Sequence, residues 1–220
     1  TRLRCDWSSD VCSSDLLRDG LAHTDAWLTY TVLRGEMTQV SIAVPNGQRI
    51  LGVSSGNAKI KGWKREPDAK RQTVVVDFLS PVKGSVTLEV HTEREFTADP
   101  IELAGRDEDG NYNGIHSVDA VRESGQVAIV AGSDLSIQFE TVKGLARIEA
   151  REVVAQLKQA DAATFKFYSP DIQLRVIAKP VEPRMLVNSR YTYQFHDDEL
   201  QLVAQLNYRI ERAGIFEIQI

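Results

Sequence analysis

The sequence predicts a mainly β chain, built from antiparallel β-sandwich domains with one short helix near residues 150–162. Three observations lead to this fold class. Apolar and polar side chains alternate along most of the 220 residues, which is the period-two pattern of half-buried strands. Turn-forming residues separate the alternating runs. The runs recur about every 8–12 residues, a spacing typical of antiparallel sandwiches rather than of parallel strands connected by helices.

The expected strands follow one another along the whole chain. In the first half they lie at 27–32, 37–44, 49–53, 58–63, 72–79 and 85–91. Pro45-Asn46-Gly47 is a strong turn signal that ends the second of these strands. In the second half they lie at 100–103, 115–120, 125–131, 135–141, 164–168, 172–178, 185–188, 190–195 and 200–210.

One segment departs from the β pattern and predicts the helix. Residues 149–163 lack glycine and proline and are rich in Ala, Glu, Gln and Lys. Val153, Val154 and Leu157 stand at helical spacing, so one side of a short helix would be apolar.

Residues 6–16 read Asp-Trp-Ser-Ser-Asp-Val-Cys-Ser-Ser-Asp-Leu. All of them match, in order, the in-frame translation of a common sequencing-library adapter. We therefore interpret residues 1–16 as a non-native, adapter-derived segment, which has to be set aside before the fold is considered. Because such a segment was never selected to pack, we expect it to be disordered or to lie on the surface.

The rest of the chain divides at Thr97-Ala98-Asp99-Pro100, a group of turn residues. We predict an N-terminally truncated β-sandwich domain at 17–97, a second β-sandwich domain with the short helix at 98–198, and final strands at 199–220. Because Ile220 falls within an expected strand, whose edge would be left without a neighbour, we expect the chain to be a fragment.

The final strands resemble the first domain. Residues 27–42 align with residues 205–220 at a constant offset of 178, which places Tyr30 on Tyr208 and Met37 on Ile215. Two interpretations stay open: the final strands begin a repeat of the first domain, or two strands of similar design match by accident.

Composition excludes several classes of partner and site. The net charge of −5 gives no electrostatic footprint for nucleic acid. Every uninterrupted apolar run is shorter than the ~20 residues that span a bilayer, so we expect no membrane insertion within the fragment. Cys5 and Cys12 lie in or beside the adapter-like segment. The remaining chain therefore has no thiol for a zinc site, a redox site or a disulfide.

The strongest metal-binding pattern is the loop Asp109-Gly110-Asn111-Tyr112-Asn113-Gly114. It places oxygen ligands at positions 1, 3 and 5 and glycine at position 6, as calcium loops do. The match then ends, because Ala120 stands at position 12 and Asp119 comes one residue early. The sequence thus offers a weak calcium site and no other cofactor; an ordinary polar loop is the alternative interpretation. The candidate calcium ligands are Asp109, Asn111, Asn113 and Asp119.

Other candidate groups have simpler explanations. His196-Asp197-Asp198-Glu199 has the residue types of a metal site but lies between two expected strands, where a hairpin turn is needed. His116 stands near the start of an expected strand; a pair with Asp119 is one interpretation, and a lone exposed or capping histidine is the favoured one. The aromatic residues do not cluster in sequence, which favours packing over a sugar-stacking platform. They are Trp27, Tyr30, Trp63, Tyr112 and Tyr168. Lysines and arginines between 59 and 71 favour a solvated edge strand.

The chain has no nucleophile elbow, P-loop or dinucleotide-binding motif. We therefore predict a non-catalytic structural or interaction module, a fragment of a larger multi-domain β-sandwich protein. Its general design resembles one part of a long bacterial multi-sandwich protein of the envelope or exterior. That resemblance implies an extracytoplasmic location and neighbouring β-sandwich domains of the parent chain as partners; a polysaccharide or protein ligand is left unspecified. The alternative is a carbohydrate- or calcium-binding accessory module of a larger enzyme, and a third interpretation is a fragment of a divided catalytic domain.

Calcium addition tests the predicted metal site. If Asp109 and its neighbours bind calcium in the folded state alone, calcium at 100 times its Kd raises the free energy of unfolding by about 2.7 kcal/mol. The measurement is the melting temperature with and without millimolar calcium, with magnesium as the control. An unchanged melting temperature in calcium would exclude the site.

Overall fold

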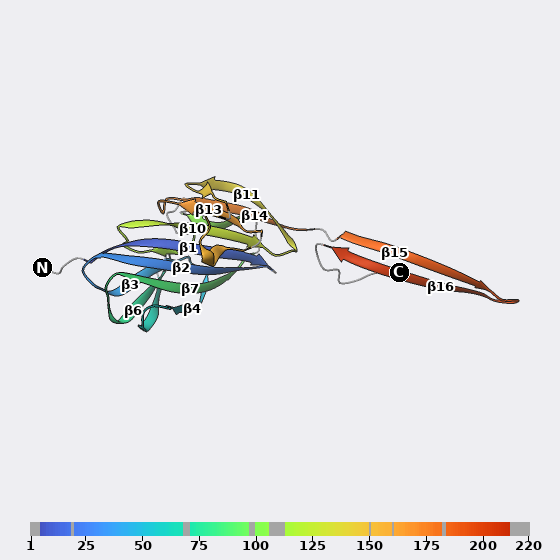
Figure 1. The fold of residues 1–220 in the computed structure, drawn as a ribbon, viewed down its shortest axis with the longest axis horizontal. Helices are drawn as coiled ribbons and strands as arrows, with labels where there is room; N and C mark the ends of the chain where they lie inside the picture. Colours follow the sequence, from blue (N-terminus) through green and yellow to red (C-terminus); the bar gives the residue numbers. More distant parts are fainter. Residues whose placement is uncertain are drawn as a thin grey trace. The chain divides into compact units, whose positions relative to one another are not determined.

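The computed structural model describes residues 5–18, 20–67, 71–96, 100–105, 113–149, 151–159, 161–181 and 184–211. Strands dominate this part of the chain (Figure 1). The first eight are β1 (Asp6–Arg18), β2 (Leu21–Arg34), β3 (Met37–Val44), β4 (Arg49–Ser54), β5 (Ile60–Pro67), β6 (Gln72–Val82), β7 (Ser85–Glu95) and β8 (Ile101–Gly105). The others are β9 (His116–Ser117), β10 (Arg122–Ala131), β11 (Leu135–Lys143), β12 (Ala146–Arg147), β13 (Ala163–Phe167), β14 (Gln173–Pro180), β15 (Arg184–Phe195) and β16 (Leu200–Glu211).

The prediction of a mainly β chain is confirmed. A seven-stranded sheet has the order β12-β13-β10-β1-β2-β7-β4, a four-stranded sheet the order β5-β6-β3-β9, and a three-stranded sheet the order β11-β14-β8. Most neighbouring strands run antiparallel, whereas β1 and β10 run parallel. The predicted turn after β3 is also present, with Gly47 at a positive φ of 86°. Among the described residues, no helix is both long enough and apolar enough to cross a membrane.

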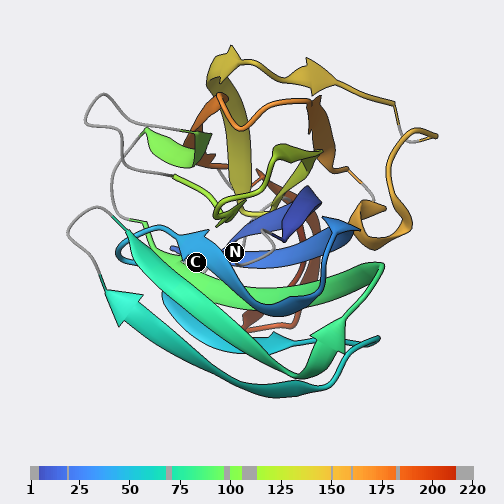
Figure 2. The ribbon, with the colours of Figure 1, turned by 90° about the vertical axis from the view of Figure 1, so that its left-hand side faces the viewer.

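The core lies between the seven-stranded and four-stranded sheets. Figure 2 shows strands of the four-stranded sheet, in light blue to teal, as a layer alongside the blue strands β1 and β2. Side chains from both layers are completely or almost completely buried, and they include Leu28, Tyr30, Val40, Ile42 and Val76. They stand at alternate positions of their strands, as the period-two pattern predicts.

The compact units differ from the predicted domains. Unit 1 comprises Thr1–Gly132 and Ile137–Ala178, and unit 2 comprises Ser133–Ser136 and Lys179–Ile220. The predicted boundary at 97–98 falls inside unit 1, because β10 and β13 join the sheet of β1, β2 and β7. Turn residues mark the end of a strand, and they do not reveal whether the next strand returns to the same sheet.

Strand β1 contradicts the expectation that residues 1–16 are disordered or lie on the surface. It lies at the centre of the seven-stranded sheet, paired with β2 on one side and β10 on the other. Val11, Cys12, Ser13, Ser14 and Asp15 are all buried, so both faces of the strand are covered. The pairing with β2 begins at Arg18 and Leu21, around the sequence Asp19-Gly20, which is a strong hairpin signal. The hairpin therefore carries the adapter-like residues into the sheet.

Glycine allows β10 to approach β1 closely. Gly125 pairs with Val11 on one side and with Phe167 of β13 on the other. A Cβ atom at this position would lie 1.8 Å from the Val11 carbonyl oxygen and 2.9 Å from Phe167 Cζ. Any larger residue would therefore force the central strands apart.

The predicted helix at 150–162 is wrong in the part of this segment that the structure describes. Only Ala155–Leu157 form a single 3-10 turn. The Gln126 amide holds the segment instead: its oxygen accepts the Val154 N–H at 3.0 Å and its nitrogen donates to the Glu152 carbonyl at 3.1 Å. These bonds engage backbone groups that an α-helix would use internally. The apolar side chains still pack, because Val153 and Leu157 cover Cys12 and Ala128 on the sheet.

Two serine substitutions in β1 test its burial. The Ser9 hydroxyl is buried and has no hydrogen-bond partner in the described part of the chain, whereas the Ser14 hydroxyl accepts a bond from Gln159 Nε2 at 3.2 Å. Ser9→Ala should raise the free energy of unfolding by about 1 kcal/mol because it removes an unsatisfied polar group. Ser14→Ala, the matched control, should lower it by about 0.5–1 kcal/mol. Urea denaturation measures both; two neutral substitutions would place β1 at the surface.

Candidate functional site

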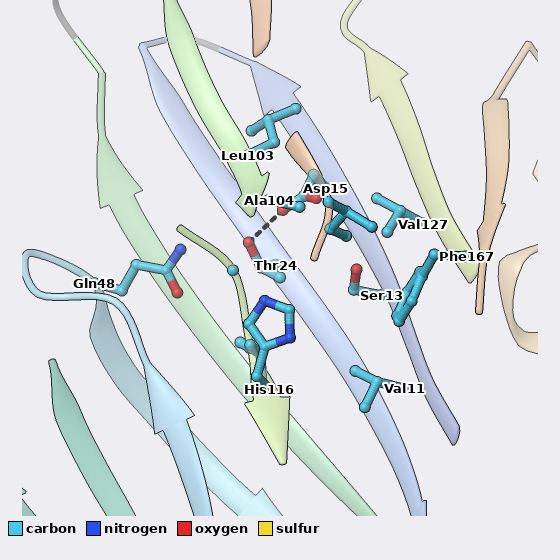
Figure 3. Close-up of a pocket in the computed structure, with 13 residues that line it drawn as sticks. Val11, Ser13, Asp15, Thr24, Gln48, Leu103, Ala104, His116, Val127 and Phe167 are labelled. Atoms are coloured by element: carbon cyan, nitrogen blue, oxygen red, sulfur yellow. Dashed lines mark hydrogen bonds between the residues drawn. The ribbon is translucent and has the colours of Figure 1, made fainter. Parts of the chain in front are cut away.

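A small polar void lies in the interior of unit 1. Its lining includes Ser13 and Asp15 of β1, Thr24 of β2, Gln48 and His116, together with apolar side chains (Figure 3). The void has a volume of about 10 Å³, which is enough room for one water molecule. The polar side chains around it make such a water favourable, so we assign the void a structural role.

Asp15 is the buried acid of this void. Its Oδ1 atom accepts a hydrogen bond of 2.6 Å from the Thr24 hydroxyl. Burial raises the pKa of the Asp15 carboxyl to about 6, against the smaller opposing effects of the Thr24 bond and the Arg94 charge. Burial likewise lowers the pKa of the Arg94 guanidinium, although the Asp15 and Glu102 charges act in the opposite direction.

A second buried polar group joins β9 to β10. His116 Nδ1 lies 2.7 Å from Glu123 Oε1, and each side chain is only 4% exposed. The other Glu123 oxygen accepts the Ser117 N–H at 2.6 Å. A carboxylate that bonds both a ring and a backbone donor fixes the two-residue strand β9 in place. Burial raises the pKa of the neighbouring Tyr30 phenol, and the Glu123 charge adds to this shift.

The His116–Glu123 pair also lines a hollow that opens to the surface. The hollow has a volume of about 340 Å³ and lies between residues 116–123 and residues 168–170. Asp119 and Arg122 are exposed side chains of the first segment, and Tyr168, 63% exposed, belongs to the second. This arrangement offers an aromatic ring, a carboxylate and a guanidinium around one concave surface.

The structure gives the predicted calcium ligands different surroundings. Asp109 and Asn111 lie outside the described residues. The Asn113 amide donates to a Glu102 carboxylate oxygen, and its backbone N–H donates to the Gly105 carbonyl at 2.7 Å. Asp119 lines the hollow, whose lining does not include Asn113. Among the described residues, no group of three or more His, Cys, Asp or Glu side chains is arranged to hold a metal ion. The four-residue calcium site stays a prediction.

The other candidates separate into core and surface residues. Tyr30 is completely buried, and Trp27 packs partly buried against the Cys12 cluster. The strand β5 lies at a sheet edge, as the basic residues around Trp63 predicted. Trp63 and Tyr168 are exposed, however, which differs from the packing that the sequence favoured for the aromatic residues. Tyr112 lies outside the described residues. The predicted turn at 196–199 is confirmed, because the His196 N–H donates to the Glu199 carbonyl at 2.9 Å.

Sequence reasoning missed the partner of His116. The sequence suggested Asp119 as the partner of His116. In the structure, His116 instead pairs with Glu123. The only signal in the sequence was the position of Glu123, next to Arg122 and two residues before the strand expected at 125–131. A charged residue at such a position is usually exposed, so the pattern alone did not distinguish it.

The Asp15 carboxyl makes stability depend on pH. The folded protein keeps the Asp15 proton up to about pH 6, whereas the unfolded chain releases it near 3.8, the ordinary value. The free energy of unfolding should therefore fall by about 3 kcal/mol as the pH rises from about 4 to 6, and then level off. Urea denaturation between pH 4 and 8 measures this. Asp15→Asn should remove this fall, and a variant that keeps it would assign the effect to another group.

No protein-family model and no curated protein matches the chain. Solved structures of similar shape include an M1 zinc metallopeptidase from Deinococcus radiodurans bound to a Tyr-Ser-Ala substrate, with a TM-score of 0.46 and 11% identity over 91% of this chain and 47% of that one. They also include native leukotriene A4 hydrolase from Saccharomyces cerevisiae, with a TM-score of 0.47 and 10% identity over 86% of this chain and 31% of that one. The chain thus spans less than half the length of either protein.

Proposed function

We propose that the chain is a non-catalytic structural and interaction module of a larger multi-domain β protein, and that the hairpin β15–β16 is its contact surface. The observation that carries this proposal is the division of the hairpin into one apolar and one polar face, with the apolar face exposed.

The register of the hairpin defines the two faces. Arg184 pairs with Glu211 and Phe195 with Leu200, and directly opposed residues point to the same face. The apolar face has aromatic or aliphatic side chains at every position except Ser189. It consists of Met185, Val187, Ser189, Tyr191, Tyr193, Phe195, Leu200, Leu202, Ala204, Leu206, Tyr208 and Ile210. The polar face consists of Arg184, Leu186, Asn188, Arg190, Thr192, Gln194, Gln201, Val203, Gln205, Asn207, Arg209 and Glu211.

The apolar face is exposed to solvent. Phe195 is 79% exposed, Tyr193 57% and Leu202 51%. An isolated two-stranded hairpin is marginally stable in water, and a sheet with one apolar face needs a second layer to cover it. Contiguous exposed apolar surface of this kind marks interaction sites in soluble proteins. These features support a role in binding another protein layer.

The resemblance between residues 205–220 and residues 27–42 supports a neighbouring β domain as that layer. At the offset of 178, Leu206 and Tyr208 align with Leu28 and Tyr30 of β2. Leu28 and Tyr30 are completely buried in unit 1, where the four-stranded sheet supplies the second layer. The same pattern on β16 therefore has the design of a core face. The partner that fits it is the apolar face of another sheet in the parent protein. An extracytoplasmic location is part of this proposal, and it rests on the resemblance to multi-sandwich proteins of the bacterial envelope.

Paired substitutions on the two faces test the contact surface. We expect the chain to associate as its concentration rises and to bind a hydrophobic dye, because water contacts the apolar face. Tyr193→Lys with Leu202→Glu, a directly opposed pair, should weaken association about tenfold or more and reduce dye binding. Light scattering after size exclusion and dye fluorescence measure these effects.

The matched control is Thr192→Lys with Val203→Glu. These residues are also directly opposed, but they lie on the polar face, so the control introduces the same charges into the same part of the hairpin. It should associate as the original chain does. Equal weakening by both pairs, or a chain that stays monomeric and binds no dye, would contradict the proposal.

A further inference from the structure

The hollow lined by the His116–Glu123 pair has walls that are fixed before any ligand arrives. Glu123 bonds His116 and the Ser117 N–H. The Val118 N–H donates to the Ser41 carbonyl at 3.0 Å, and the Val121 N–H donates to the Trp7 carbonyl at 2.9 Å. The short connection from β9 to β10 is therefore tied to two neighbouring strands, β3 and β1, and Glu123 bonds its two ends together. Binding residues are commonly carried by loops that a rigid scaffold positions in this way.

Asp119 occupies a strained position in that connection. Its φ of 61° lies in the left-handed region, which non-glycine residues seldom adopt, although aspartate tolerates it better than most. Such a conformation persists where the surrounding bonds impose it, and it is found repeatedly at ligand-binding sites. Here it belongs to an exposed carboxylate at the mouth of the hollow.

The opposite wall presents an aromatic ring that is also held in place. The Lys166 ammonium lies 5.1 Å from the centroid of the Tyr168 ring, a cation–π contact that restrains the ring. After it, the Ile172 N–H donates to the Pro170 carbonyl at 3.0 Å and closes a tight turn. The Tyr168 ring is therefore contacted by Lys166 and is otherwise mostly exposed.

The charges of the walls select the class of ligand. Asp119 repels anions and Arg122 repels cations, so a simple phosphate or a simple amine meets one unfavourable charge. A neutral ring with several hydroxyl groups meets neither: its hydroxyls donate to the carboxylate and accept from the guanidinium. Its C–H face can pack on the amphipathic Tyr168 ring. The volume of about 340 Å³ falls at the small end of the range of ligand pockets.

We infer that this hollow binds one sugar unit of a neutral carbohydrate, with Tyr168 as the stacking ring and Asp119 and Arg122 as the hydroxyl-binding groups. The His116–Glu123 pair positions the Asp119 segment. This binding site is separate from the hairpin surface, so either can exist without the other.

Titration of the isotopically labelled chain with defined sugars tests the inference. The probes are the methyl glycosides and trisaccharides of glucose, galactose, mannose and N-acetylglucosamine at millimolar concentration. At least one series should shift the backbone amide signals of residues 117–122 and 168–169. Glycine as a zwitterion and inorganic phosphate are titrated in parallel. Binding of either of these without binding of any sugar, or the absence of any shift with all probes, would overturn the inference.

Variants then assign the binding groups. Tyr168→Ala should weaken sugar binding about tenfold or more, whereas Tyr168→Phe should change it by less than about threefold because the ring is retained. Asp119→Gly, which keeps the positive φ accessible and removes the carboxylate, should also weaken binding about tenfold. Trp63→Ala on the edge strand β5 removes an exposed aromatic ring outside both proposed binding surfaces; it is the matched control and should leave sugar binding unchanged. Equal effects of Tyr168→Ala and Trp63→Ala would place the sugar elsewhere.

Discussion

The position of β1 at the centre of the seven-stranded sheet is the constraint on which unit 1 depends. It pairs with β2 over nearly its whole length, and through β2 with β7 and β4. On its other side it pairs in parallel with β10, which brings β13 and β12 into the same sheet. Within the seven-stranded sheet, β1 therefore joins the strands of residues 21–95 (β2, β7 and β4) to the strands of residues 122–167 (β10, β13 and β12). The void around Asp15 and the connection that carries Asp119 both lie against it.

The composition of β1 is poorly suited to that position. A strand covered on both faces normally reads as a nearly continuous apolar run, whereas the buried stretch of β1 contains Ser13, Ser14 and Asp15. Some of these groups gain compensation, since Thr24 bonds Asp15 and Gln159 bonds Ser14. Ser9 gains none in the described part of the chain. A central position is thus filled partly by buried polar side chains. The adapter interpretation of residues 6–16 stays a prediction, but the disordered or surface segment that it led us to expect is not what the structure has, since Cys12 lies in a core cluster.

The sequence predicted individual strands well and their assembly poorly. Alternation located β2, β3, β6, β7 and β16 because this pattern is local. In β2 and β7 it matches alternating burial, whereas the residues of β16 are mostly exposed. The sheet order is set by contacts between distant strands, so the turn signals near residue 98 were read as a domain boundary. The helix prediction failed because Gln126, a residue of another strand, holds the backbone of residues 152–154. The candidate site also depends on contacts between distant strands, which a local pattern does not show. Asp119 and Tyr168 were noticed singly, but their common hollow arises from the pairing of β10 with β13.

The hairpin β15–β16 shows how pattern and exposure can be used together. A period-two pattern of apolar residues indicates which face of a strand is suited to burial. It does so even where the layer that would cover this face is not part of the chain. The solvent exposure of the side chains shows which face of the strand is covered in the structure. In β2 the apolar pattern and the burial agree, since Leu28 and Tyr30 belong to the apolar face and are completely buried. In β16 the apolar pattern and the burial disagree, since Leu202 belongs to the apolar face but is half exposed. Because alternation over two paired strands of this length is costly to keep on a solvated surface, the disagreement supports our proposal that another layer of protein covers this face. The hollow beside Tyr168 requires no such cover, since its mixed polar and aromatic lining is compatible with water.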